Sequence, residues 1–231
     1  MIEPQRKLIL WMSCLAHAVQ DGLTAAVYVL LPVLAQALGL NLTEVGLFKG
    51  LKSLTQGLLE IASGVASERY GDRALLVFGL ALSGSGYLLF SLADSGIAVL
   101  ACLVVVGVGT AFQHAPSSAL ISRAYASSGR RGALGLYNSA GDAGKLIFTT
   151  SFSLAVGAGL AWHTATFAYG LAGVLAALTV FVVLRNTALA TAVHHNTGVD
   201  GANSSGEQAT KWGVLDRNGF MALLAVVFLD S

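Results

Sequence analysis

The sequence predicts an all-α integral membrane protein, built as a six-helix transmembrane bundle followed by the start of a seventh helix. Of its 231 residues, 55% are hydrophobic and 11% are charged, whereas an average soluble domain carries about 25% charged residues. The mean hydropathy is +0.72, and a water-soluble chain of this length cannot hide so much apolar surface. Apolar segments of roughly twenty residues also recur, and this is the length that crosses a bilayer.

Apolar segments give the expected order of the spans, which are residues 8–38, 45–67, 74–93, 97–120, 132–156 and 162–184. The short connections between them predict antiparallel neighbours packed as one bundle. Arg6 and Lys7 precede the first segment as they would in a signal peptide. That segment is much longer than a signal core of about 7–15 residues, so we expect a retained helix. The 27 glycines are expected mainly to let helices approach closely.

The chain divides into three expected parts. Residues 1–186 form the transmembrane domain, 187–216 a cytoplasmic polar linker, and 217–231 the start of a truncated seventh helix. His194 and His195 lie in the linker without further ligands at a regular spacing, which favours a solvated segment over a metal site. The apolar stretch near the end is too short to cross about 30 Å. We therefore expect a fragment or truncated product that lacks a carboxy-terminal six-helix half.

Basic residues predict the orientation. Most lysines and arginines lie before the first span, in alternate connections or in the linker: Arg6, Lys7, Arg69, Arg73, Arg123, Arg130, Arg131, Arg185, Lys211 and Arg217. The opposite connections have none, so the positive-inside rule places the amino terminus in the cytoplasm. The net charge of +1 predicts no nucleic-acid partner, and the two cysteines imply no disulfide framework.

Charged residues inside the spans mark the candidate functional residues. Each costs roughly 2.5–3.5 kcal/mol on insertion scales, so such residues usually face a water-filled pathway and pair with one another. Polar residues recur at intervals of three and four as one stripe on the second segment and another on the fifth: Lys49, Lys52, Gln56 and Glu60, then Asn138, Asp142, Lys145 and Thr149. We interpret these stripes as lining a polar cavity for substrate and protons, with no metal. The alternative is a structural Asp142–Lys145 pair and a Lys49 side chain that reaches the interface.

Two further segments contribute to this expected pathway. The first contains His17 and Asp21, four residues apart on one helix face, and the fourth contains His114 just before a helix-bending Pro116. A carboxylate in a low-dielectric site can carry a proton near neutral pH. Asp21, Glu60 and Asp142 all qualify in principle, but the neighbouring Lys145 makes Asp142 a poorer proton carrier. We favour Asp21, beside His17, as the proton site.

The connection after the second segment carries a recognisable motif. It reads Gly64-Val65-Ala66-Ser67-Glu68-Arg69-Tyr70-Gly71-Asp72-Arg73, which resembles the Gly-x-x-x-Asp-Arg-x-Gly-Arg cytoplasmic signature of the major facilitator superfamily. In that pattern Glu68 replaces the usual aspartate, Asp72 stands where arginine is more common, and Arg73 follows one position later. The resemblance implies a cytoplasmic gate formed by charge pairs and helix-end dipoles, with these residues: Gly64, Glu68, Arg69, Gly71 and Arg73.

The same resemblance implies a fold and an activity. In that superfamily two six-helix halves flank a central site and rock about it. His17 and Asp21, and the run from Gly107 to Pro116, resemble the fosmidomycin-resistance type of efflux permease. The implied protein is a secondary transporter in a bacterial inner membrane that moves a small solute by alternating access, coupled to protons and without a cofactor. No nucleotide-binding loop is present, so ATP is not expected to drive it directly.

Two other classes stay open at this stage. Gly84-Ser85-Gly86 and His163 resemble parts of a rhomboid-type intramembrane serine hydrolase, but a nucleophile and its base must lie within hydrogen-bond reach. Nothing in the sequence aligns these two residues, so we expect no enzyme. A non-transporting scaffold or remnant, or a half that dimerises, is the remaining alternative. The solute, its charge and the direction of transport are not fixed by the sequence.

Overall fold

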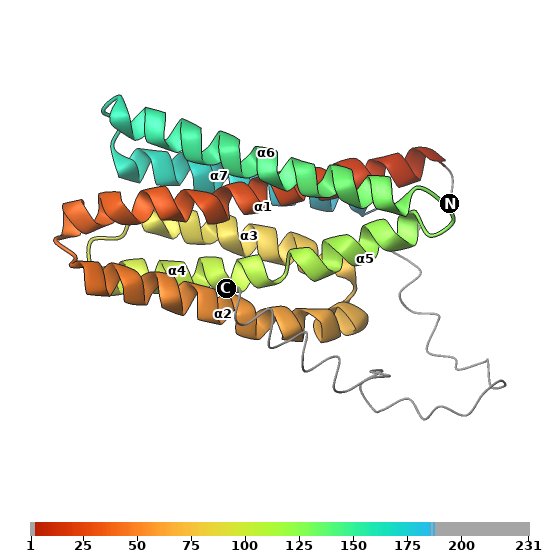
Figure 1. The fold of residues 1–231 in the computed structure, drawn as a ribbon, viewed down its shortest axis with the longest axis horizontal. Coiled ribbons are helices and arrows are strands. Elements are labelled where there is room, and N and C mark those ends of the chain that lie inside the picture. The colour runs from red at the N-terminus through yellow and green to blue at the C-terminus, as the bar shows by residue number, and fades with distance from the viewer. Residues whose placement is uncertain (1–2, 186, 188–231) are drawn as a thin grey trace. The chain divides into compact units, whose positions relative to one another are not determined.

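The computed structural model describes residues 3–185 and Thr187, and these residues form a bundle of long helices (Figure 1). The helices are α1 (Glu3–Leu38), α2 (Leu42–Tyr70), α3 (Asp72–Phe90), α4 (Gly96–Ala111), α5 (His114–Ala124), α6 (Arg130–Gly157) and α7 (Trp162–Leu184). The predicted all-α bundle is confirmed. The predicted linker, apart from Thr187, and the predicted seventh helix lie outside the described residues.

Four stretches are long and apolar enough to cross a membrane on length and composition alone: α1, α3, α4 with α5, and α7. The other two long helices, α2 and α6, contain 29 and 28 residues. These two carry the polar stripes, which lower their hydropathy. All six predicted segments are therefore helical, and α4 and α5 are two halves of the predicted fourth span.

Local sequence explains several helix ends. Asn41 begins α2 with a capping box, in which its side chain accepts from the Glu44 N–H at 2.9 Å and the Glu44 carboxylate accepts from the Asn41 N–H at 2.8 Å. Gly71 alone joins α2 to α3, with a φ of +84° that favours glycine. The connection expected between the second and third spans is thus a single residue, and the charged motif lies on the two helix ends.

The fourth span breaks at Phe112 and Gln113, between α4 and α5. The N–H groups of these residues donate to Gly109 and Thr110 with the tighter i→i−3 spacing. Pro116 accounts for the position, because its ring clashes with the carbonyl four residues earlier, which belongs to Phe112. The expected bend is therefore present, one turn before the proline, and it makes His114 the first residue of α5.

The centre of the bundle is α1, which packs against α6, α7, α5 and α3 and runs between α6 and α3 in Figure 1. Its buried residues extend over most of its length, from Ile9 to Leu34. In contrast, α2 buries only Lys52 and Ser63 within the described residues. Side chains on α1 therefore have neighbours from several helices, and this helix positions the candidate site.

Candidate transport site

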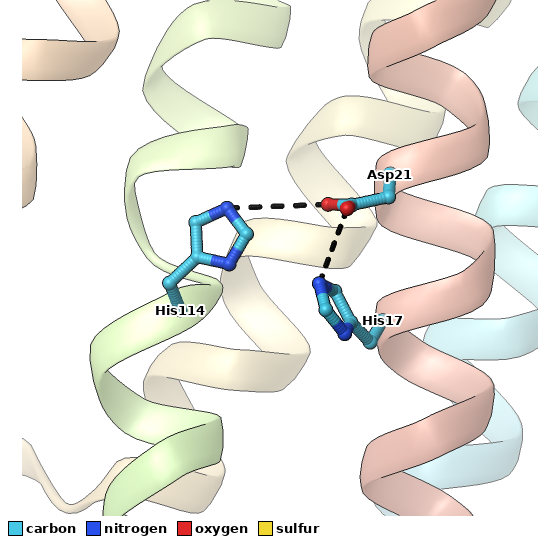
Figure 2. A group of neighbouring side chains, drawn as sticks. All are labelled: His17, Asp21 and His114. Atoms are coloured by element: carbon cyan, nitrogen blue, oxygen red, sulfur yellow. Dashed lines mark ion pairs between the residues drawn. The ribbon is translucent and has the colours of Figure 1, made fainter. Parts of the chain in front are cut away.

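Asp21 is the centre of a cluster of ionisable side chains. Its Oδ2 lies 3.2 Å from His17 Nε2 and 3.2 Å from Lys145 Nζ, and its Oδ1 lies 3.9 Å from His114 Nε2. Figure 2 shows the two imidazole rings approaching the carboxylate from different sides, His17 from the same helix and His114 from the start of α5. The structure thus brings together four predicted pathway residues from α1, α5 and α6.

Glycines on α6 explain how the cluster forms. A methyl group on Gly144 would collide with the backbone of Ala18, and one on Gly141 would lie 2.6 Å from the His17 ring. These two positions therefore let α6 pack directly on α1. Lys145, beside this seam, then reaches across it to Asp21.

The orientation of His17 follows from its other ring nitrogen. Nδ1 lies 2.9 Å from the backbone carbonyl oxygen of Tyr137, and a carbonyl only accepts, so Nδ1 carries the hydrogen. The ring also stacks on the Tyr137 side chain, with centroids 3.9 Å apart. Nε2 therefore faces Asp21. A second proton on this ring makes an ion pair, whereas a bare nitrogen lone pair beside a carboxylate is repulsive.

Exposure rises steadily across the cluster. The side chains of His17 and Asp21 are 6% and 7% exposed, that of His114 is 38% and that of Lys145 is 49% exposed. Lys145 also binds Asp142 Oδ1 at 3.1 Å, and the Asp142 side chain is 75% exposed. One lysine therefore joins a buried carboxylate to an open one, and this places the cluster at the edge of the described bundle.

A second polar network lies beside Asp21 along α1. Gln20 Nε2 donates to Ser83 Oγ at 2.7 Å and to Thr110 Oγ1 at 3.1 Å, and Thr24 Oγ1 lies 3.2 Å from Thr110 Oγ1. These bonds tie α1 to α3 and α4 and hold its polar face in register. Sequence reasoning missed Ser83, Thr110 and Tyr137, although a polar residue within an apolar span is itself a signal.

The predicted stripe on α2 behaves differently. Lys52 is 4% exposed and its Nζ donates to Gln56 at 2.9 Å, while Lys49 Nζ lies 4.9 Å from the centre of the Tyr28 ring. Among the described residues no ion pair joins this stripe, including Glu60, to Asp21. Asn138 on α6 is exposed and also lies outside the cluster. The two predicted stripes therefore do not merge into one contact network.

The predicted gate is centred on Asp72, which is not one of the five residues that the motif assigned to it. Asp72 is 2% exposed and is bound by Ser67 Oγ and by the guanidinium of Arg123. Arg73 Nη1 donates to the Leu184 carbonyl at 3.0 Å, which links the start of α3 to the end of α7. A cavity of about 280 Å³ lies beside these contacts, lined by Gly64, Ser67, Glu68, Asp72, Ala115, Ala119 and Arg123.

Arg69 and Glu68 contribute less to these contacts. Arg69 lies 5.5 Å from the centre of the ring of its neighbour Tyr70, and the exposed Glu68 lines the cavity. The acidic residue at position 72, which departs from the usual pattern, is thus the one that α5 engages through Arg123.

The cluster also has the donor set of a metal site. One ligand atom each from His17, Asp21 and His114 lie within 4.8 Å of one another. Lys145 Nζ, however, approaches the same Asp21 oxygen as His17 does. This ammonium group supplies the positive charge that a metal would supply, so the arrangement favours an ion-pair network.

The residues considered for a hydrolase point to other partners. Ser85 Oγ donates to the Ala81 carbonyl of its own helix at 2.8 Å, and the His163 ring stacks on Trp162 with centroids 3.5 Å apart. In the part of the chain that the structure describes, no hydrogen bond joins Ser85 to His163. These residues therefore do not form the nucleophile–base pair that such chemistry needs.

Comparisons with known proteins agree with the fold. The chain is 31% identical over 127 residues to the multidrug resistance protein MdtH of Aeromonas hydrophila, a match that covers 52% of this chain and 31% of that protein. It is 30% identical over 124 residues to the fosmidomycin resistance protein of Escherichia coli, covering 54% of this chain and 30% of that protein. The matches thus span about a third of each curated relative.

A solved structure and a family pattern extend the similarity over nearly the whole chain. A bacterial homologue of the human lysosomal transporter Spinster, in an inward-facing and unoccupied conformation, aligns with a TM-score of 0.62 and 16% identity. That alignment covers 90% of this chain and 47% of the solved one. The pattern of the Major Facilitator Superfamily matches residues 13–229. The chain is therefore an integral membrane protein that belongs to the Major Facilitator Superfamily of transporters.

Proposed function

We propose that the chain is the amino-terminal half of a secondary active transporter that moves a small solute by alternating access, driven by protons. The observation that carries the proposal is the buried Asp21 carboxylate with Lys145, His17 and His114 around it. Such a cluster inside spanning helices is expensive unless it serves a pathway. The remaining half supplies the opposite wall of that pathway.

Lys145 links the charge of Asp21 to the contact between two helices. With Asp21 ionised, the Lys145 ammonium bridges α6 to α1 at 3.2 Å. A proton on Asp21 removes the negative charge that holds Lys145 there. Lys145 Nζ then keeps its ion pair with Asp142 Oδ1, 3.1 Å away on the same helix. Proton binding therefore loosens one helix contact, which is the kind of two-state element that alternating access requires.

The charged contacts at the ends of α2 and α3 complete the proposed cycle as the cytoplasmic gate. This assignment follows the orientation expected from the basic residues, with the amino terminus in the cytoplasm of a bacterial inner membrane. Asp72 with Arg123, and Arg73 with the end of α7, are contacts between helices that can break when the halves rock. The resistance proteins among the relatives favour export of the solute.

The test uses the full-length protein in proteoliposomes. We would impose a pH gradient and follow the fluxes of fosmidomycin and tetracycline, because resistance to these compounds names two of the relatives. Asp21→Asn should abolish the pH-driven flux, since the amide cannot exchange a proton. The matched control is Asp94→Asn, which changes an exposed carboxylate outside the cluster and should leave the flux unchanged.

Two outcomes contradict the proposal at different levels. Asp21→Asn protein that retains pH-driven flux excludes Asp21 as the proton site. Unaltered full-length protein that moves neither compound nor protons under any gradient favours the non-transporting alternative. A full-length product of about twice this length, with about twelve spans, is the expected starting material.

A further inference from the structure

A second cavity lies at the beginning of α1, far along the helix from Asp21. It has a volume of about 280 Å³ and is lined by Glu3, Arg6, Lys7, Tyr125 and Ser128. Figure 1 shows the start of α1 beside the turn that joins α5 to α6. We call this place the α1 corner cavity. No step of the proposed transport cycle uses it.

Arg6 is fixed in this cavity and has unused capacity. Its Nη2 donates to the Ser128 carbonyl at 3.0 Å, and its guanidinium lies 4.4 Å from the centre of the Tyr125 ring. The Arg6 side chain is only half-buried and lines the cavity. Its guanidinium is held in place by these two contacts and can offer its other terminal N–H groups to an acceptor such as phosphate.

The surroundings favour a negative ligand. Glu3 is already paired with Lys7 at 3.0 Å, and the hydrogen bond from Lys7 lowers the pKa of Glu3, which keeps this pair charged. Within the described residues Arg6 forms no ion pair, and α6 begins just beyond Ser128 with two exposed arginines, Arg130 and Arg131. Arg6 and Lys7 therefore line the cavity with Glu3, and the two arginines follow Ser128 closely in the sequence.

The position along α1 relates the cavity to the membrane surface. The apolar part of α1 starts at Leu8, and Trp11 lies one turn further with 58% of its surface exposed. Exposed tryptophans gather at the level of lipid headgroups. A phosphate in the α1 corner cavity therefore lies at headgroup depth, with Leu8 and Trp11 placed to contact acyl chains.

We propose that the α1 corner cavity binds the phosphate of an anionic phospholipid headgroup, with Arg6 as its main ligand and Arg130 and Arg131 as supporting charges. Basic pockets between helices on one side of a membrane protein are known to suit such headgroups. The exposed apolar residues Leu8 and Trp11, which follow Lys7 on α1, favour a lipid over free phosphate. The site does not depend on the proton-coupled function, because it shares no residue with the Asp21 cluster.

The experiment titrates phosphatidylglycerol into full-length protein held in micelles of a phosphate-free maltoside detergent and measures bound lipid by native mass spectrometry. Arg6→Gln should weaken phosphatidylglycerol binding about tenfold, the loss expected for a hydrogen bond to a charged group. Arg6→Lys keeps the charge and should lose less. Arg185→Gln is the matched control, because it removes an exposed arginine at the end of α7, outside the cavity, and it should bind normally.

The readouts separate this proposal from simpler explanations. Equal elution profiles and melting temperatures for Arg6→Gln and the unaltered protein exclude misfolding, and Arg131→Gln gives an independent and smaller loss of lipid. Equal weakening by Arg185→Gln would mean general charge attraction and would overturn the site. Displacement of phosphatidylglycerol by millimolar inorganic phosphate would overturn the lipid assignment. Lipid binding is read without any flux, so a failure of the transport proposal leaves this test intact.

Discussion

The helices α2 and α6 carry similar polar stripes and similar glycines, yet the bundle treats them differently. On α6, Gly141 and Gly144 press against α1, and Lys145 beside them reaches Asp21. On α2, a methyl group added at any of four glycines would meet nothing within 4 Å, and these are Gly46, Gly50, Gly57 and Gly64. The glycines of α6 thus belong to a packed seam, whereas those of α2 lie on an uncovered face. The charged stripe of α2 is partly covered, with Lys52 buried and Lys49 exposed.

The difference shows what a polar stripe alone leaves undecided. On α6 the glycines and the charged residues occupy neighbouring faces. Close packing of the glycines on α1 therefore places the charged side chains at the edge of the contact between α1 and α6. On α2 the exposed face carries an apolar ridge that includes Leu47, Leu51, Leu54 and Leu58, and no described helix covers it. A stripe becomes a charge network only where the small residues beside it bring a second helix into contact.

The largest expected effect concerns the seam itself. Gly144→Ala places a methyl group against the backbone of Ala18, and a backbone cannot move aside as a side chain can. We expect a loss of about 1–3 kcal/mol of stability, as for other overpacked sites. Gly57→Ala on the open face of α2 is the matched control, and it should be neutral or stabilising by up to about 1 kcal/mol.

Thermal unfolding of the full-length protein in detergent, followed by circular dichroism, measures both changes. Equal stability of the two variants would break the comparison, because it would mean that α6 does not pack closely on α1. A loss at Gly57 instead would mean that the uncovered face of α2 is tightly packed in the complete protein.

Much of the fold could be predicted because hydropathy in lipid is a strong signal. The six apolar segments, their order and the bend before His114 all follow from local sequence. The break between α4 and α5 begins at Phe112, four residues before Pro116. A proline ring clashes with the carbonyl four residues earlier in a helix, so the position of Pro116 predicts a break at Phe112.

The candidate site could be predicted only in part. His17 and Asp21 share one helix, so their contact at 3.2 Å follows from the spacing of four. The approach of Lys145 depends on how two helices pack, which no single span specifies. The bond from His17 to Tyr137 uses a backbone carbonyl, which has no residue signature at all.

The predicted gate shows the same division. The motif directed attention to the ends of α2 and α3 and gave weight to Glu68, whereas Asp72 is the buried residue that Arg123 of α5 binds. Its partner Arg123 lies about fifty residues further along the chain. A family pattern indicates where charges gather, and the contacts depend on which of them the bundle buries.

A second and smaller effect compares lysines on the two stripes. Lys145→Met removes a charged hydrogen-bond donor from Asp21 and should cost about 1 kcal/mol, because the half-exposed ammonium is screened by solvent, with a loss of pH-driven flux. Lys49→Met is the control on α2, because its side chain is exposed and only lies over Tyr28. It should change stability by less than about 0.5 kcal/mol. Indistinguishable losses in melting temperature and flux would mean that both stripes serve one network after all.

The smallest expected change in stability is at Gly141, and it sharpens the comparison most. Here the three nearest atoms to the added methyl all belong to the His17 ring. A side chain can shift where a backbone cannot, so Gly141→Ala should cost less than about 1 kcal/mol. The turned ring loses its Tyr137 bond and its approach to Asp21, so flux should fall although the protein stays folded. In a His17→Ala background, where the ring is absent, Gly141→Ala should have no further effect on flux. If the losses of flux in the two single variants add up in the double variant, Gly141 affects flux independently of His17. The contact between α6 and α1 would then set the position of α1 and not the orientation of the His17 ring.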